Sequence, residues 1–207
     1  GEEELLDAAN HPNRSELGSR KVPFSREIYI EKNDFMEDPP GKFYRLKPGG
    51  EVRLRYAYII RCEEIIRDSS GDIVALRCTY DPDTRSGDGI NQRKVKGTIH
   101  WVSARHAERL EVRLYDRLFL SPNPDQGDVP FADSLNSRSM EVVKEAALEQ
   151  GLSEANIGDT FQFERLGYFC VDTVHSEQGQ PVFNRTVTLR DSWAKNEKQA
   201  LASISNR

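Results

Sequence analysis

Short runs of alternating apolar and polar residues recur along most of this 207-residue chain, and turn-forming residues separate them. Successive side chains of a strand point to opposite faces, so such runs predict strands with one buried face. Within residues 94–102, KVKGTIHWV, alternate positions share a face: Val95, Gly97, Ile99 and Trp101. The sequence from Asp68 to Asp72, DSSGD, joins two further runs as a hairpin connection does. Many short strands and little helix indicate a mainly β fold, either a barrel or a sandwich.

One segment does not follow this alternation of apolar and polar residues. Between Ser139 and Gln150 the apolar residues follow helical spacing, and Gly151 supplies a C-terminal stop. We therefore expect one amphipathic helix whose apolar stripe packs on the core. Just before it, residues 121–130, SPNPDQGDVP, hold three prolines and a glycine and form the best candidate for a domain boundary.

The composition, 37% hydrophobic and 30% charged residues, is typical of a soluble globular protein. No window approaches the roughly 18 consecutive apolar residues of a membrane span, and no signal segment opens the chain, so we expect a cytoplasmic location without membrane contact. The three cysteines, Cys62, Cys78 and Cys170, each lie in an apolar strand pattern, which favours buried reduced thiols. The polar residues 196–207 are expected to be a tail or the start of a connection to a further domain.

Positive charge is concentrated in residues 42–61, KFYRLKPGGEVRLRYAYIIR. This segment has six basic residues and one acid, Glu51, in a chain whose net charge is −5. Alternation through residues 52–62 places Arg53 and Arg55 on one polar face, roughly 7 Å apart, a spacing that can address neighbouring phosphates or bases. A solvated face of an antiparallel strand is the alternative explanation. A second basic segment, residues 92–113, supports a localised anionic partner, while the pI near 5.5 argues against sequence-blind nucleic-acid binding.

Catalytic and metal-binding patterns are missing from the sequence. The four histidines lie far apart, and the pair His100 and His106 has neither zinc spacing nor a third ligand. We find no phosphate-binding glycine loop, no nucleophile elbow and no cysteine in a nucleophile context. The chain therefore reads as a recognition module and not as an enzyme by itself.

Several long motifs resemble the C-terminal anticodon-binding region of glutaminyl-tRNA synthetases, which are class I glutamine–tRNA ligases. In chain order they are NHPN, GSRKVPFS, YRLKPGGEVRLRYAYIIRC, CTYD, KVKGTIHWVSA, VRLYDRLF, FQFERLGYFCVD and VFNRTVTLRDSWAK. The resemblance covers about residues 10 to 195. Related glutamyl-tRNA synthetases share the architecture, but the motifs FQFERLGYFC and FNRTVTLRDSWAK are more similar to the glutaminyl branch.

The resemblance implies two stacked β-barrels of the ribosomal-protein-L25-like type, which bind the anticodon loop of glutamine tRNA. The first barrel would span residues 23–119, and the second would combine residues 1–22 with 120–195. Glutaminylation with ATP and Mg²⁺ would belong to a catalytic domain of the same synthetase that is absent from this chain, so no cofactor is expected here. The protein would act as a monomer whose partners are the tRNA and that catalytic domain.

The resemblance also implies roles for individual residues in RNA binding. Pro12 and Asn13 would contact the anticodon loop, and Arg45 a base or a phosphate. Lys42 and Tyr44 depart from the usual glutamine and lysine, which exchanges an amide or charge contact for phosphate contact or stacking. The residues expected near the first base are Arg53 and Arg55, those around the central base are Gln162, Glu164 and Arg165, and Ser192 would complete the edge of a pocket.

Strand geometry adds one condition to this assignment. In a regular strand Gln162 and Glu164 face away from Arg165, so grouping the three requires a strand end or bulge near Leu166. Two other functions stay open at this point. One is the anticodon domain of a glutamyl-tRNA synthetase, and the other is a structural or ribosomal RNA-binding barrel, which would prefer duplex or ribosomal RNA.

Overall fold

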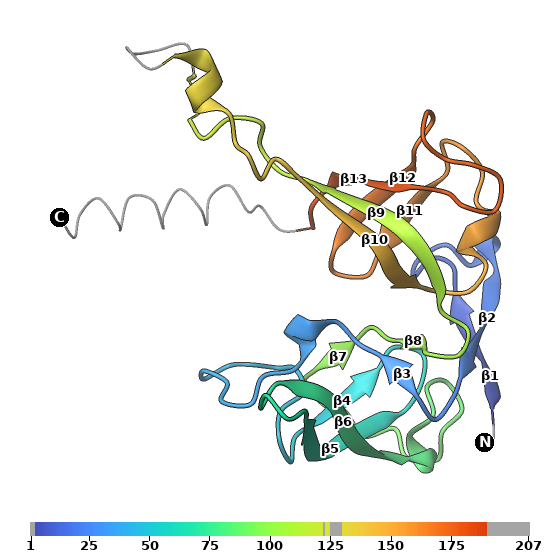
Figure 1. Ribbon diagram of the computed structural model, residues 1–207. Coiled ribbons are helices and arrows are strands. Elements are labelled where there is room, and N and C mark those ends of the chain that lie inside the picture. Colours follow the sequence, from blue (N-terminus) through green and yellow to red (C-terminus); the bar gives the residue numbers. More distant parts are fainter. Residues whose placement is uncertain (1–2, 122, 125–129, 190–207) are drawn as a thin grey trace. The chain divides into compact units, whose positions relative to one another are not determined.

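The computed structural model describes residues 3–121, 123–124 and 130–189 (Figure 1). The chain divides into two compact units, residues 1–107 and 108–207, and each has its own β-sheet structure and hydrophobic core. Among the described residues, no helix is long and apolar enough to cross a membrane. The barrel limits expected from the sequence stay a prediction.

The described part of unit 1 contains eight strands in three sheets. The largest sheet has the order β6-β5-β4-β7, while β1 pairs with β2 and β3 pairs with β8. Three short 3-10 helices complete the unit: η1 (Ser15–Leu17), η2 (Lys32–Asp34) and η3 (Pro82–Thr84). The strands are β1 (Glu4–Ala9), β2 (Ser19–Phe24), β3 (Ile28–Tyr29), β4 (Glu51–Leu54), β5 (Ile59–Arg67), β6 (Ile73–Asp81), β7 (Thr98–Ile99) and β8 (Val102–Ser103).

The hairpin expected at Asp68 is confirmed. The Asp68 carboxylate accepts hydrogen bonds from the backbone N–H groups of Ser70 and Asp72, at 2.9 and 3.0 Å, and so holds the turn between β5 and β6. Of the four residues expected on one face, Gly97, Ile99 and Trp101 are buried, and Val95 is half-buried. Together with the inner faces of β4 and β5, Ile99 and Trp101 build a core that includes Leu46, Val52, Leu54 and Ile60.

The expectation of one alternating face through residues 52–62 is wrong. Strand β4 ends at Leu54, and the chain turns back so that Val52 lies opposite Ile60. Backbone hydrogen bonds close the turn, from Leu54 N to Tyr58 O at 2.8 Å and from Ala57 N to Leu54 O at 3.0 Å. Because Arg55 lies in this turn and Arg53 in the strand, the two arginines do not share a strand face.

The described residues of unit 2 form a five-stranded sheet of order β10-β9-β13-β12-β11, in which β9 and β13 are parallel and the other pairs are antiparallel. The 3-10 helix η4 (Phe131–Ser134) precedes β10 in the chain, and η5 (Leu152–Glu154) follows it. Its core is centred on Val112, Phe169 and Phe183. The strands are β9 (Glu108–Tyr115), β10 (Met140–Leu148), β11 (Thr160–Phe163), β12 (Gly167–Val171) and β13 (Phe183–Val187).

The amphipathic helix expected at residues 139–150 is wrong, because this segment forms strand β10 and pairs with β9. A register shift between Val143 and Ala146 interrupts the alternation, so the side chains that pack on the core are Val143, Ala146 and Leu148. A bulge thus places apolar residues three positions apart, as a helix does. Tertiary pairing along β9 decides the outcome in favour of the strand.

The mainly β fold class is confirmed. Pairings among the described strands leave both larger sheets unclosed, so barrel closure stays a prediction. All three cysteines are free thiols, and Cys62 lies directly opposite Cys78 across β5 and β6. Burial is the main cause that raises the pKa of Cys78 to about 12.

Candidate nucleic-acid interface

The structure places the predicted site residues in several separate segments. Pro12 and Asn13 lie in the exposed loop between β1 and β2 of unit 1. The segment that leads into β4 carries Lys42 and Arg45, and β4 and its turn carry Arg53 and Arg55. Gln162, Glu164 and Arg165 belong to unit 2, and Ser192 lies outside the described residues.

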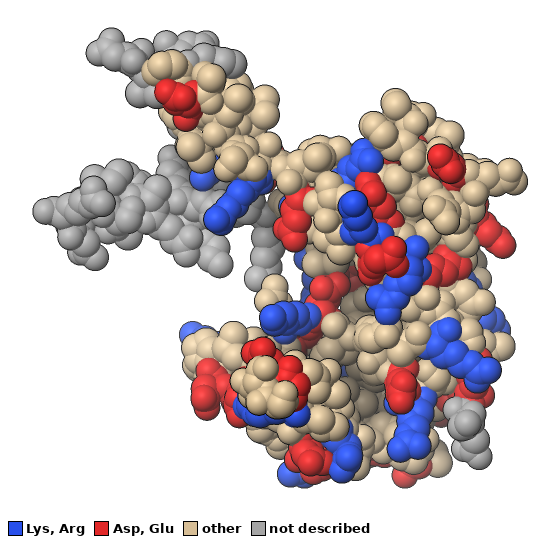
Figure 2. Space-filling model, in the orientation of Figure 1, with Lys and Arg blue, Asp and Glu red and all other residues tan. Residues whose placement is uncertain are grey.

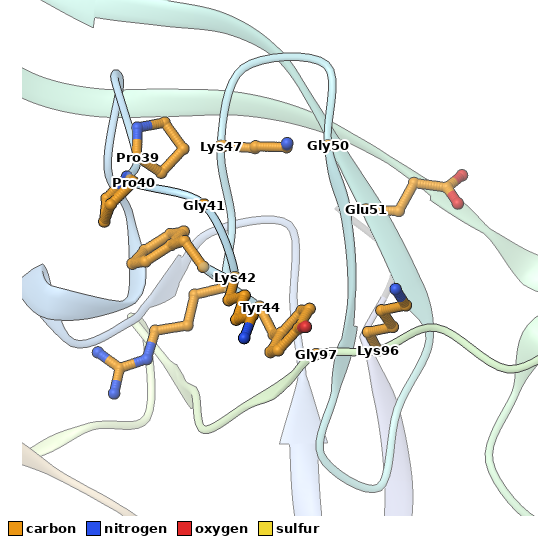
Figure 3. Close-up of a pocket in the computed structure, with 12 residues that line it drawn as sticks. Pro39, Pro40, Gly41, Lys42, Tyr44, Lys47, Gly50, Glu51, Lys96 and Gly97 are labelled. Atoms are coloured by element: carbon orange, nitrogen blue, oxygen red, sulfur yellow. The ribbon is translucent and has the colours of Figure 1, made fainter.

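A pocket of about 380 Å³ opens in unit 1 in front of β4 (Figure 3), and we call it the cationic pocket. Four cationic side chains and one carboxylate, Glu51, line it, together with the aromatic rings of Phe43 and Tyr44. Figure 3 shows Tyr44 between Lys42 and Lys96. The Tyr44 side chain is half exposed, and the Lys96 ammonium lies 5.5 Å from the centre of its ring, within the range of a cation–π contact. The cationic residues are Lys42, Arg45, Lys47 and Lys96.

A glycine allows the two walls of the cationic pocket to meet. A Cβ atom at Gly97 would stand 2.2 Å from the backbone oxygen of Tyr44 and 3.1 Å from Val52 Cγ1, far inside normal contact. The lack of a side chain at Gly97 therefore lets the Lys96–Gly97 segment lie directly against the Tyr44 segment. The requirement for glycine here is steric, because the φ angle of Gly97 is not in the positive region.

Glu51, the acid in this pocket, is paired with an arginine. Arg93 donates two hydrogen bonds to the Glu51 carboxylate, at 2.7 and 3.0 Å, in a bidentate arrangement. This hydrogen bonding lowers the pKa of Glu51 below its ordinary 4.5 and raises that of Arg93. Because Glu51 is ion-paired, the lysines determine the charge that the pocket offers to a ligand.

Arg45 lines the pocket but also supports its base. Its Nη1 donates to the backbone oxygen of Asn33 at 2.6 Å, and its Nε lies 3.5 Å from Oδ1 of Asp34, which is completely buried. The backbone of Asp34 in turn accepts a hydrogen bond from Leu46 N at 2.9 Å. Arg45 therefore balances a buried carboxylate, and its predicted RNA contact has to be compatible with that role.

Arg53 holds the loop of residues 84–93 against the β4–β5 turn. Its Nη1 donates to the backbone oxygens of Thr84 and Ala57, at 2.7 and 3.3 Å, and to Ser86 Oγ at 3.2 Å. Its Nη2 donates to the backbone oxygen of Arg93 at 3.3 Å. Burial, and secondly the charge of Arg93, lowers the pKa of Arg53. Arg53 borders a second pocket of about 310 Å³, lined by Ser86, Gly87, Gln92, Arg93, Lys94 and Val95 as well.

Arg55 lies beside the ring of Tyr56, with its guanidinium carbon 5.1 Å from the ring centre. The backbone of Arg55 is fixed on both sides, since its N–H donates to Ile99 O at 3.0 Å and its oxygen accepts from Trp101 Nε1 at 2.8 Å. The turn thus presents the Arg55 side chain from a rigid backbone.

In unit 2 the condition for grouping Gln162 with Arg165 is met. Strand β11 ends at Phe163, and Glu164 and Arg165 form the turn to β12, with Arg165 at a φ of 64°. The turn is closed by a hydrogen bond from Leu166 N to Phe163 O at 3.0 Å. Since the strand stops before Glu164, the alternation that separates these side chains no longer applies. Their contact with RNA stays a prediction.

The second basic segment is less available to a ligand than its charge suggests. Arg93 pairs with Glu51, and Arg113 pairs with Glu111 at 2.7 Å. Arg105 lies 3.6 Å from Glu3. On the face drawn in Figure 2, Lys and Arg side chains are interspersed with Asp and Glu. The basic residues of this segment that line a pocket are Arg93, Lys94 and Lys96.

The sequence did not single out three residues that the structure brings to these surfaces. Lys47 and Lys96 line the cationic pocket, and Arg20 lies by the ring of Tyr56. Lys47 and Lys96 fall within the two basic segments, so the local concentration of positive charge in the sequence could have identified them as candidate site residues. Arg20 is on β2, far from Tyr56 in the sequence, and only the fold brings the two together.

Comparison with known proteins identifies related sequences. Residues 1–81 match a family described as "tRNA synthetases class I (E and Q), anti-codon binding domain", and residues 98–172 match a second family with that description. The glutamine–tRNA ligase of Bradyrhizobium diazoefficiens is 50% identical over 94% of this chain, and that of Pseudomonas putida is 53% identical over 93%. That of Escherichia coli O157:H7 is 53% identical over 94% of the chain. The chain spans about a third of the length of these relatives.

Proposed function

Because this chain belongs to the anticodon-binding domain family of the class I (E and Q) tRNA synthetases, we propose that it binds the anticodon loop of glutamine tRNA as part of a glutamine–tRNA ligase. The glutaminyl assignment is supported by the identity to glutamine–tRNA ligases along nearly the whole chain. Translation in the cytoplasm is the corresponding setting. We assign ATP, Mg²⁺ and the transfer of glutamine to the catalytic domain of that enzyme.

The observation that carries the proposal is the cationic pocket of unit 1. It combines an aromatic ring that is half exposed with several ammonium groups, and its one acid is held by Arg93. Unpaired loop bases of RNA offer flat faces for stacking and edges for hydrogen bonds. A base that enters the pocket stacks on Tyr44, while Lys42, Lys47 and Lys96 meet its edge and the neighbouring phosphates.

Substitutions in the cationic pocket are expected to change the affinity for RNA by a measurable amount. Stacking of a base on an aromatic side chain contributes about 1–3 kcal/mol. Replacing Tyr44 by alanine is therefore expected to weaken RNA binding by about tenfold or more, since about 1.4 kcal/mol corresponds to a factor of ten. Lys96→Gln removes a cation both from the pocket and from the Tyr44 ring, so binding weakens and its dependence on salt becomes less steep.

The test is binding of the 207-residue chain to the anticodon stem-loop of glutamine tRNA, compared with a copy that carries one changed anticodon base. We expect tighter binding of the unchanged loop, and weaker binding by both variants. Arg77→Gln is the matched control, because Arg77 is 69% exposed on β6 and pairs with Glu64 away from the pocket. Equal binding of the two loops by the wild-type chain contradicts the proposal, and preference for a glutamate tRNA loop assigns the chain to the glutamyl branch.

A further inference from the structure

Unit 2 carries an exposed aromatic ring beside an exposed amide on the outer face of its sheet. Gln162 of β11 lies directly opposite Tyr168 of β12, and Tyr168 lies opposite Val187 of β13. Residues that lie opposite each other on neighbouring strands share a face, with Cβ atoms about 5 Å apart. The three side chains therefore form a row across three adjacent strands (Figure 1), and we call this row the Tyr168 platform.

The Tyr168 ring lies on the opposite side of the sheet from the core of unit 2. Its neighbours in β12, Gly167 and Phe169, are buried, whereas Tyr168 is 41% exposed. Val187 is 57% exposed, and Gln162 is exposed as well. Alternation along the strands thus sends the neighbouring residues inward and turns the platform outward, where its ring can pack against a ligand.

The polar groups of the platform are available for hydrogen bonding. Among the residues that the structure describes, neither the Gln162 amide nor the Tyr168 hydroxyl has a hydrogen-bond partner. An amide side chain offers both donors and an acceptor, and a phenolic hydroxyl can act in either role. A flat ring with such groups beside it suits a ligand that has a flat face and a polar edge.

The backbone holds the platform in place before any ligand binds. The register between β12 and β13 shifts at Thr186, and the Thr186 hydroxyl donates to the backbone oxygen of Tyr168 at 3.1 Å. A Cβ atom at Gly167 would stand 2.3 Å from the backbone oxygen of Val187, so glycine at this position lets the two strands approach each other. Because the platform is built on paired strands, little conformational freedom is lost when it binds a ligand.

An unpaired RNA base is the ligand that fits these features. Bases of single-stranded RNA stack on exposed aromatic side chains of β-sheets and present their pairing edges to nearby polar groups. Gln162 and Tyr168 both fall within residues 98–172, which match the second anticodon-binding domain family. Unit 2 is therefore expected to supply an RNA contact of its own.

We propose that one base of the anticodon loop stacks on Tyr168 while the Gln162 amide bonds to the edge of that base. This inference rests on the proposed function and adds to it a second base-binding surface, which lies in unit 2, whereas the cationic pocket lies in unit 1. The motifs in the sequence gave Gln162 a role near the central base and gave none to Tyr168. The ring fixes the plane of the base, and the amide then meets its edge in a defined orientation.

The test measures binding of the 207-residue chain to the anticodon stem-loop of glutamine tRNA and to three copies that each lack one anticodon base. Tyr168→Val removes the ring and keeps a residue that favours strands. We expect it to weaken binding of the intact loop by about tenfold, the scale of one lost stacking contact. For the copy that lacks the stacked base, Tyr168→Val and the wild type are expected to bind equally.

Two further variants separate the ring from the amide. Tyr168→Phe keeps the ring and is expected to recover most of the affinity for the intact loop. Gln162→Leu keeps the approximate size of the side chain but removes the amide, so it is expected to reduce the preference for the cognate loop over a copy with a changed base at the stacked position. Arg77→Gln again serves as the control, and thermal unfolding checks that the variants keep their fold.

The outcomes distinguish the platform from the proposed function. Wild-type affinity in Tyr168→Val overturns the platform, and so does an equal loss for the intact loop and all three copies. A loss in Tyr168→Phe as large as that in Tyr168→Val also overturns it, because the ring alone is then not the contact. Equal binding of the cognate and changed loops by the wild-type chain refutes the proposed function instead.

Discussion

Removal of the Arg53 side chain tests whether this arginine is mainly a structural clamp. In the folded chain its guanidinium donates four hydrogen bonds to the loop formed by residues 84–93 and to the β4–β5 turn. The backbone oxygen of Ala57 also accepts hydrogen bonds from the N–H and the hydroxyl of Ser86. It therefore still has two donors when Arg53 is replaced. The oxygens of Thr84 and Arg93 lose the arginine donor. At about 1 kcal/mol for each of these two oxygens, Arg53→Ala is expected to lower the free energy of unfolding by about 2 kcal/mol.

The assay is urea unfolding of the 207-residue chain, followed by circular dichroism. Arg77→Ala is the control and is expected to change the free energy of unfolding by less than about 0.5 kcal/mol, because exposed ion pairs contribute little. Arg53→Lys keeps the charge but loses the planar fork, so it is expected to recover only part of the loss. An Arg53→Ala variant as stable as the Arg77→Ala control would refute the clamp, and any loss of RNA affinity in it would then reflect direct contact.

Two further predictions concern unit 1. Gly97→Ala forces a Cβ atom to within 2.2 Å of the Tyr44 backbone oxygen, so we expect a loss of about 1–3 kcal/mol in denaturant unfolding. Gly41→Ala adds a Cβ atom that meets nothing within 4 Å, and an equal effect of the two variants would contradict the steric argument. Burial, and secondly a hydrogen bond to Glu4, raises the pKa of Tyr58 from 10.0 to about 12. The protonated Tyr58 hydroxyl therefore contributes fully to the stability of the fold below pH 10, and this contribution is lost as the pH rises towards 12. Melting temperatures across that pH range should fall more steeply for the wild type than for Tyr58→Phe.

The sequence predicted much of the strand pattern, because alternation and turn chemistry act locally. The turn at Asp68 depends on a side chain that bonds its own neighbouring N–H groups, so it can be recognised from a few residues. The segment containing Val143 and Ala146 could not be assigned in this way. Its bulge is defined only by pairing with β9, and the resulting apolar spacing imitates a helix.

For the candidate site, charge in the sequence located the cationic segment but not the use of each charge. Arg53 and Arg45 stand in a segment dense with cations, yet much of their hydrogen bonding goes to backbone oxygens within unit 1. Lys96 lies beside Tyr44, and Arg20 beside Tyr56, only because the fold brings together segments that are far apart in the sequence. A single sequence shows where cations are frequent, whereas the fold decides which of them face a ligand.

The three thiols of this chain differ in their accessibility to chemical labelling. Cys62 is completely buried, and the high pKa of Cys78 keeps it in the protonated form that reacts poorly with maleimides. Cys170, half-buried on β12, is then the thiol that a maleimide dye modifies first. A fluorophore could therefore be attached to unit 2 without any cysteine replacement.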